Sequence, residues 1–292
     1  MHRTPGHTPG EYYETNIKGA ENVTNWASEN GISKIVFTSS ISVYGPNNEL
    51  LDENCTTNPV SDYGKSKLMA EEIHSQWQSE DLKNRSLVIC RPAVVFGPGE
   101  RGNFTRLAKA LKRHYFFYPG GRETQKASGY VKDATRSLIF FAEKDIKNIV
   151  YNFSFPKNYT IGEICDAFCA IAKYANPISI PVARIGKILS TRKGPIGNLG
   201  QRLLKLVFPT NIASTKLQEF GFIWRYDLES ALRDWKQESQ DSFELQRLNY
   251  GQYRVTTPYK RIDFFLRGKR YHDITNQVRG DFEDFLDCIL LI

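Results

Sequence analysis

The sequence has few of the residues that build disulfide-linked or metal-centred proteins. It contains five cysteines in 292 residues, an odd number, and their spacing matches neither a paired disulfide framework nor a zinc motif. Cys165 and Cys169 stand one helical turn apart in an amphipathic pattern, which favours buried thiols. The five histidines are scattered along the chain. We therefore expect no metal site.

Long hydrophobic runs are also absent. The apolar runs are too short to span a bilayer, and residues 1–10 lack the apolar region of a signal peptide. The composition is nevertheless 40% hydrophobic and 13% aromatic, enough for a sizeable core in a chain of this length. We expect a soluble, cytoplasmic protein with no membrane span.

The chain is basic, with a net charge of +7 and a pI near 9.0. Its lysines and arginines are spread along the sequence, and no motif typical of DNA or RNA binding is present. We therefore expect no nucleic-acid partner. An anionic small-molecule substrate would account for part of the charge.

Helical and strand-like patterns alternate, which predicts an α/β protein. The expected strands are residues 34–38, 87–90 and 148–155. The expected helices are residues 11–30, 63–79, 103–113, 130–141 and 160–174, the last opened by a capping box at Thr160 and Glu163.

One helix carries a pair of residues suited to proton transfer. Tyr63 and Lys67 are four residues apart and share a helix face, so the lysine charge could favour the ionised phenol. Lowering a phenol pKa by about 3 units needs roughly 4 kcal/mol, about what one cation near 4 Å supplies at a dielectric constant of about 20. Ser40, which follows a strand, could hold the oxygen that reacts. On its own, however, this spacing more often marks only the start of an amphipathic helix.

Four segments give the pair a context. In order they are Tyr12-Tyr13-Glu14-Thr15-Asn16-Ile17-Lys18-Gly19, Ile35-Val36-Phe37-Thr38-Ser39-Ser40-Ile41-Ser42-Val43-Tyr44-Gly45, Tyr63-Gly64-Lys65-Ser66-Lys67 and Arg91-Pro92-Ala93-Val94-Val95-Phe96-Gly97-Pro98-Gly99. Residues 11–236 thereby resemble the extended short-chain dehydrogenase/reductases, in particular the nucleotide-sugar epimerase/dehydratase branch.

The resemblance implies roles for individual residues. The implied catalytic groups are the acid/base Tyr63, the lysine Lys67 that also binds the nicotinamide ribose, the hydroxyl partner Ser40, and Asn16, which completes a proton relay. An NAD or NADP cofactor would be bordered by Tyr63, Lys67, Ser39, Arg91, Pro92 and Val94. A nucleotide-sugar would be held by Ser40, Asn103 and Lys126, where Lys126 stands at a position that often carries arginine in relatives.

The start of the sequence departs from the family pattern. The family begins with a strand, a glycine-rich turn and a helix that bind the cofactor pyrophosphate, whereas residues 1–10 have no strand pattern and cannot form that turn. We therefore expect an N-terminally truncated doubly wound Rossmann sheet, with an unpaired apolar edge at residues 34–38. Three explanations stay open: a fragment or late-started gene model, a truncated inactive relative, and a chain completed by another polypeptide.

The family resemblance also divides the chain. Residues 1–236 would form the truncated domain, with a small substrate-binding part mainly in 98–130 and 176–236, while 237–292 form an unassigned C-terminal extension. Ile41-Ser42 stand where the dehydratases carry Asp-Glu, which disfavours dehydration. The hypothesis is a UDP-sugar 4-epimerase, with a 4-keto-sugar reductase or a non-catalytic binder of a nucleotide-sugar or a partner chain as alternatives. The oligomeric state stays open, with a homodimer as one option.

Overall fold

The computed structural model describes residues 8–100, 102–118, 121–179, 191 and 209–238, together with the strands at 253–256 and 261–264. Much of the expected substrate-binding segment 176–236 lies outside these residues. Nearly all of the expected extension 237–292 also lies outside the described residues. Its described strands, β10 (Tyr253–Thr256) and β11 (Arg261–Phe264), form an antiparallel pair.

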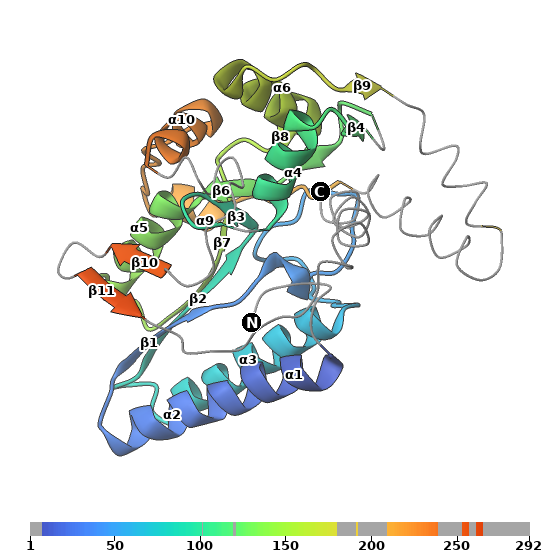
Figure 1. Ribbon diagram of the computed structural model, residues 1–292. Coiled ribbons are helices and arrows are strands. Elements are labelled where there is room, and N and C mark those ends of the chain that lie inside the picture. Colours follow the sequence, from blue (N-terminus) through green and yellow to red (C-terminus); the bar gives the residue numbers. More distant parts are fainter. Residues whose placement is uncertain are drawn as a thin grey trace.

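A parallel three-stranded sheet forms the centre of the described fold (Figure 1). Its strands are β1 (Lys34–Thr38), β2 (Ser86–Pro92) and β7 (Asn148–Phe153), in the order β1-β2-β7. Within the described residues β1 pairs only with β2, and Val36 on β1 is 36% exposed. The predicted apolar edge at residues 34–38 is thus confirmed for this part of the chain.

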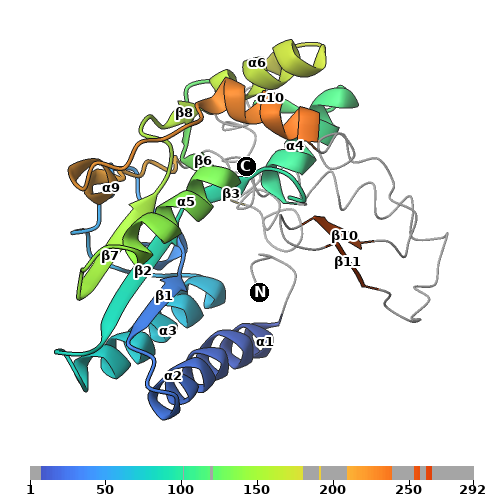
Figure 2. The same cartoon turned by 90° about the vertical axis from the view of Figure 1, so that its left-hand side faces the viewer.

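Side chains that alternate along β2 divide the core between the two faces of the sheet. Leu87 and Ile89 pack with Ala27 and Trp77, which come from α2 (Gly19–Glu29) and α3 (Asp62–Ser79). Val88 and Cys90 pack on the other face, beneath α5 (Val131–Ala142). Figure 2 shows the sheet between these two layers of helices. The predicted α/β class with a parallel sheet is confirmed.

The helix expected over residues 11–30 is continuous but changes its winding. It begins as α1 (Pro9–Tyr13), widens to a π-helix, η1 (Glu14–Lys18), and continues as α2. Gly31 then ends it with a φ of +64°, a backbone conformation that glycine adopts without strain. The sequence pattern did not predict the π-helical turn, which contains Asn16.

A second group of helices lies beyond the carboxyl ends of the central strands (Figures 1 and 2). It consists of α4 (Asn103–Lys112), α6 (Ile161–Ala172) and α10 (Leu228–Glu238), which share one aromatic-rich core around Phe104, Phe168 and Trp235. The capping box predicted at Thr160 and Glu163 is present at the start of α6.

Short elements complete the described chain. They are η2 (Ile41–Val43), β3 (Val94–Phe96), β4 (Phe117–Tyr118), β5 (Gln125–Lys126), β6 (Ser128–Tyr130), β8 (Tyr159–Thr160), β9 (Ile178–Ser179) and α9 (Thr215–Glu219). Among the described helices, none has the length and apolar character needed to cross a membrane.

Candidate active site

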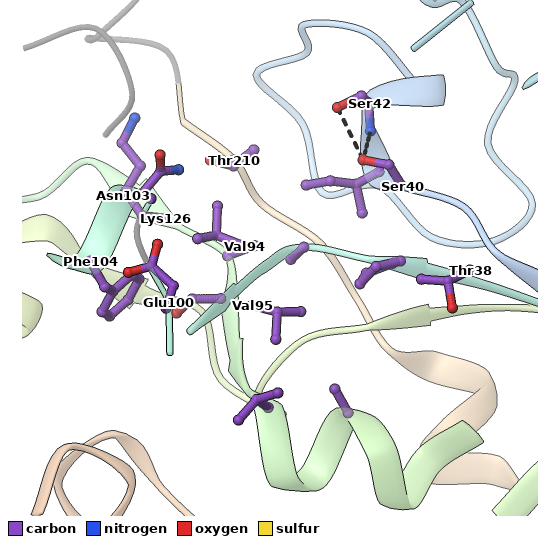
Figure 3. A pocket seen from close by; sticks show the side chains of 18 of the residues that line it. Thr38, Ser40, Ser42, Val94, Val95, Glu100, Asn103, Phe104, Lys126 and Thr210 are labelled. Atoms are coloured by element: carbon purple, nitrogen blue, oxygen red, sulfur yellow. Dashed lines mark hydrogen bonds between the residues drawn. The ribbon is translucent and has the colours of Figure 1, made fainter. Parts of the chain in front are cut away.

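A cavity of about 880 Å³ opens at the carboxyl ends of β1 and β2 (Figure 3). Most of the residues singled out in the sequence line it, although they come from five separate segments: Thr38, Ser39, Ser40, Tyr63, Lys67, Pro92, Val94, Asn103 and Lys126. Open α/β sheets bind their ligands at this end of the strands. Asn16 and Arg91 are not among the lining residues.

Ser40 is held in place by the short helix that follows it. Its Oγ accepts a hydrogen bond from the Ser42 backbone N–H at 3.1 Å and donates to the Ser42 Oγ at 3.1 Å. Ser40 therefore caps η2, and the cap fixes the hydroxyl at the wall of the cavity (Figure 3).

Tyr63 lies in the first turn of α3, close to the Ser40 loop. Ser61 caps this helix by accepting a hydrogen bond from the Gly64 N–H at 3.0 Å. A Cβ at Gly64 would come within 2.5 Å of the Ser42 carbonyl oxygen, so only glycine lets the helix approach the loop this closely. The close approach brings the phenol and the Ser40 hydroxyl to one wall.

The pKa of Tyr63 differs from the expectation. Burial raises the pKa of Tyr63, a hydrogen bond with Ser40 lowers it by less, and Tyr12, whose ring centroid is 5.7 Å away, raises it further. The Lys67 ammonium instead donates to the Thr38 carbonyl oxygen at 2.9 Å and lies 5.1 Å from the centroid of the Phe37 ring. The prediction that Lys67 lowers the pKa of Tyr63 is therefore wrong for this structure, because the ammonium is directed towards β1.

Asn16 contacts α3 rather than the cavity. Its Nδ2 donates to the Ser66 Oγ at 2.9 Å, and that hydroxyl in turn donates to the Tyr63 carbonyl oxygen at 3.0 Å. π-Helical turns are frequent at functional sites, and this one directs a buried amide at the turn of α3 that carries Tyr63. The catalytic role of Asn16 stays a prediction.

The expected substrate-binding residues lie at the far wall of the cavity. Figure 3 places Asn103, at the start of α4, beside Lys126 of β5. Burial lowers the pKa of Lys126 to about 8. A lysine cation next to an amide side chain suits an anion.

Glu100 and Ser128 are among the cavity residues that were not anticipated. The Glu100 carboxylate accepts a hydrogen bond from the Thr105 backbone N–H at 2.9 Å, so it caps the start of α4. Burial raises the pKa of Glu100. The position of Glu100 just before a predicted helix could have indicated this capping role, whereas nothing in the sequence indicates that Ser128 lines the cavity.

The wall near Tyr63 and Lys67 is a candidate surface for a nicotinamide ring. Pro92 and Val94 give it an apolar surface, and Ser39 is 2% exposed with a hydroxyl that has no hydrogen-bond partner among the described residues. A buried hydroxyl without a partner costs free energy, which a polar ligand group would recover. By contrast, the Arg91 side chain turns away and bonds to Glu71 and Tyr44. Within the described residues, no group of three or more His, Cys, Asp or Glu side chains could hold a metal ion.

The sequence of this chain is similar to those of known proteins. The sequence model of the NAD dependent epimerase/dehydratase family matches residues 4–154. An Escherichia coli O157:H7 protein, N-acetyl-alpha-D-glucosaminyl-diphospho-ditrans,octacis-undecaprenol 4-epimerase, is 31% identical over 234 residues, which cover 76% of this chain and 70% of that protein. The UDP-glucose 4-epimerase of Vibrio cholerae is 31% identical over 107 residues, which cover 35% of this chain and 31% of that protein.

Solved structures share the fold. The Bacillus cereus UDP-glucuronic acid 4-epimerase in complex with NAD aligns with a TM-score of 0.62 at 19% identity, covering 82% of this chain and 72% of that one. The Thermotoga maritima UDP-glucose 4-epimerase with UDP-glucose aligns with a TM-score of 0.62 at 23% identity, covering 78% and 70%. Family match, relative and fold agree, and this chain belongs to the NAD dependent epimerase/dehydratase family.

Proposed function

We propose that this protein is an NAD(P)-dependent 4-epimerase of a sugar carried on a diphosphate, acting through a 4-keto intermediate. The observation that carries the proposal is the lining of one cavity by Ser40, Tyr63 and Lys67 at one wall and by Asn103 and Lys126 at the other. The first wall suits an alcohol that loses its proton and hydride. The second suits an anion.

The chain's own residues would move and orient one proton. Tyr63 would take the proton of the sugar 4-hydroxyl, and Ser40 would hold the same oxygen. The nicotinamide, when bound, supplies a hydride acceptor for C4 and a positive charge. Because burial raises the pKa of Tyr63 in this chain, that charge would be needed to favour the phenolate. Pro92, Val94 and Ser39 would border the ring.

A nucleotide-sugar such as a UDP-hexose is the first substrate candidate. The Asn103 amide would donate to the diphosphate, and Lys126 would contribute a charge. A lysine supplies this charge without the two-pronged geometry of an arginine. The named relatives and structural neighbours that act on UDP-sugars support this candidate.

A lipid-linked sugar diphosphate is the second candidate. The E. coli relative, which covers three quarters of this chain, is named for a sugar on diphospho-undecaprenol. The cavity also has apolar side chains beside Asn103, namely Phe104 and Leu107 of α4 and Ile161 and Ile164 of α6. Both substrates would present the same sugar diphosphate to Lys126 and Asn103. An experiment must therefore compare substrates that differ in the group attached to the diphosphate, a nucleoside or a lipid.

The test is incubation of the protein with NAD and either UDP-N-acetylglucosamine or N-acetylglucosaminyl-diphospho-undecaprenol in detergent. Epimerisation at C4 without added reductant is expected, and the substrate that turns over identifies the carrier. Strict consumption of NADPH would instead identify a 4-keto-sugar reductase.

Two variants separate catalysis from binding alone. Tyr63→Phe should abolish turnover, whereas Tyr13→Phe should not, because the Tyr13 hydroxyl contacts Asp62 at 3.4 Å outside the cavity. If calorimetry detects sugar-diphosphate binding but no NAD binding, and neither variant differs from the parent, the protein is a non-catalytic binder.

A further inference from the structure

Arg91 makes a buried set of contacts that the proposed reaction does not use. It lies on β2, is 8% exposed and does not line the cavity. Its Nε and Nη2 donate to the two carboxylate oxygens of Glu71 at 2.9 and 2.6 Å, and its Nη1 donates to the Tyr44 hydroxyl at 3.0 Å. One planar guanidinium therefore bonds in two fixed directions.

The first direction leads to the catalytic helix. Glu71 follows Lys67 by four residues and Tyr63 by eight on α3, so all three project from one side of the helix. The bidentate pair with Arg91 thus fixes both the rotation and the depth of the helix face that carries Tyr63 and Lys67. A lysine in place of Arg91 would keep the charge but lose this two-point contact.

The second direction leads to the loop that carries Ser40. Tyr44 directly follows η2, the helix that Ser40 caps. The Arg91 guanidinium lies 5.0 Å from the centroid of the Tyr44 ring, and the Tyr44 hydroxyl donates to the Asn152 Oδ1 at 2.8 Å. Tyr44 is 4% exposed and is therefore fixed by both packing and hydrogen bonds.

These contacts join two segments that must meet for chemistry. Ser40 and Tyr63 are far apart in sequence and come from different elements, yet both have to contact one substrate oxygen. We infer that Arg91 is a positioning residue, which locks the Ser40 loop and the Tyr63–Lys67 face of α3 to each other through Tyr44 and Glu71. This inference rests on the proposed function, since it assigns Arg91 a task in that reaction.

Electrostatics give the same residues a second effect. The Glu71 carboxylate raises the pKa of Lys67, against the lowering caused by burial. Arg91 balances the Glu71 charge, so its loss would leave that carboxylate buried and unpaired beside the catalytic lysine. If the Arg91–Glu71 ion pair were only structural, its loss would change the stability of the fold but not the pKa of Lys67.

Tyr44→Phe is the sharpest variant, because it removes only the hydroxyl that receives Arg91 and leaves the ring packed. We expect kcat to fall by about 10-fold or more with little change in KM, since small misplacements of reacting groups act on the chemical step. Arg91→Lys should act in the same direction and more strongly.

The control is Arg85→Lys. Arg85 is also held by a glutamate, with its Nη1 2.7 Å from Glu80, and it lies over the Trp77 ring, but at the far end of α3 from Tyr63. We expect this variant to lose stability without any change in kcat.

An assay independent of turnover uses the Tyr63 phenol. With ring-labelled tyrosine, NMR follows its titration, assigned by comparison with Tyr63→Phe. Because Ser40 lowers the pKa of Tyr63, misalignment in Tyr44→Phe should move the titration to higher pH, whereas Arg85→Lys should leave it unchanged. If Tyr44→Phe and Arg91→Lys retain both the parent kcat and the parent titration, Arg91 is only structural and the inference is wrong. If the parent protein shows no turnover, the proposed function fails, and the titration alone still decides the role of Arg91.

Discussion

The Lys67 ammonium donates a hydrogen bond to the Thr38 carbonyl oxygen across 2.9 Å, and so joins α3 to the end of β1. Its position at the cavity wall follows from this contact and from the Phe37 ring beneath it. The backbone of the strand that leads to Ser40 thus holds the lysine, and the ammonium has a fixed position at the cavity wall.

Lys67→Met tests the catalytic role of this charge. We expect kcat to fall by about 100-fold or more, the usual range for removing a group from a proton-transfer site, because the cavity wall would lose the Lys67 cation and the contact that ties α3 to the end of β1. Steady-state kinetics at saturating substrate measure the loss. The control is Lys65→Met, two residues earlier on α3 at an exposed position, which should keep the parent rate. Equal rates for both variants would remove Lys67 from the mechanism.

Ser40→Ala should change the pH dependence of the reaction. Burial raises the pKa of Tyr63 and the Ser40 hydroxyl lowers it, so removal of this hydroxyl should raise the pKa. A base acts only when deprotonated, and the rising limb of kcat/KM against pH should therefore move to higher pH. A profile from pH 6 to 10 measures the shift. A lower rate with an unchanged limb would mean that Ser40 contacts the substrate without affecting Tyr63.

The sequence predicted the central elements well because their signals are local. Strand β1 has the predicted bounds 34–38, and α3 begins one residue before the predicted start at Tyr63. The four-residue spacing also placed Tyr63 and Lys67 at one wall of the cavity. These features depend on apolar runs, caps and helix periodicity.

The direction of the Lys67 and Arg91 side chains could not be predicted in the same way. Lys67 donates to a carbonyl 29 positions away in sequence, and that contact depends on how α3 packs on β1. Strand alternation does offer a signal for Arg91, since it shares a face of β2 with Leu87 and Ile89, which pack under α2 and α3. This signal places Arg91 near α3, but the pairing with Glu71 requires the three-dimensional structure.

Asp133→Asn should destabilise the protein. Asp133 is fully buried, and its carboxylate accepts hydrogen bonds from the backbone N–H groups of Arg225 and Tyr226 at 3.1–3.2 Å. It also forms an ion pair with Arg136 at 2.6 Å. An amide cannot accept with both ends, so we expect a loss of about 2–4 kcal/mol in the free energy of unfolding. Urea denaturation measures it, with the exposed Asp145→Asn as control. A loss no greater than that of the control would contradict the role of Asp133 as the link between α5 and the segment before α10.

Lys126 should set the alkaline limit of substrate binding. Burial lowers the pKa of Lys126 to about 8, so the ammonium that would face the diphosphate is present below about pH 8 and lost above it. We expect kcat/KM to fall above this pH, and Lys126→Arg to remove the fall because a guanidinium stays charged.

Lys126→Met should weaken binding while stabilising the fold near neutral pH. The folded-state pKa lies below the unfolded value of 10.5, so desolvation of this half-buried ammonium opposes folding by up to about 3 kcal/mol below about pH 8, and the cost disappears as the pH rises to 10.5. Kinetic pH profiles and thermal unfolding of the same variants measure both effects. A Lys126→Met protein that binds substrate as tightly as the parent would place the diphosphate elsewhere in the cavity.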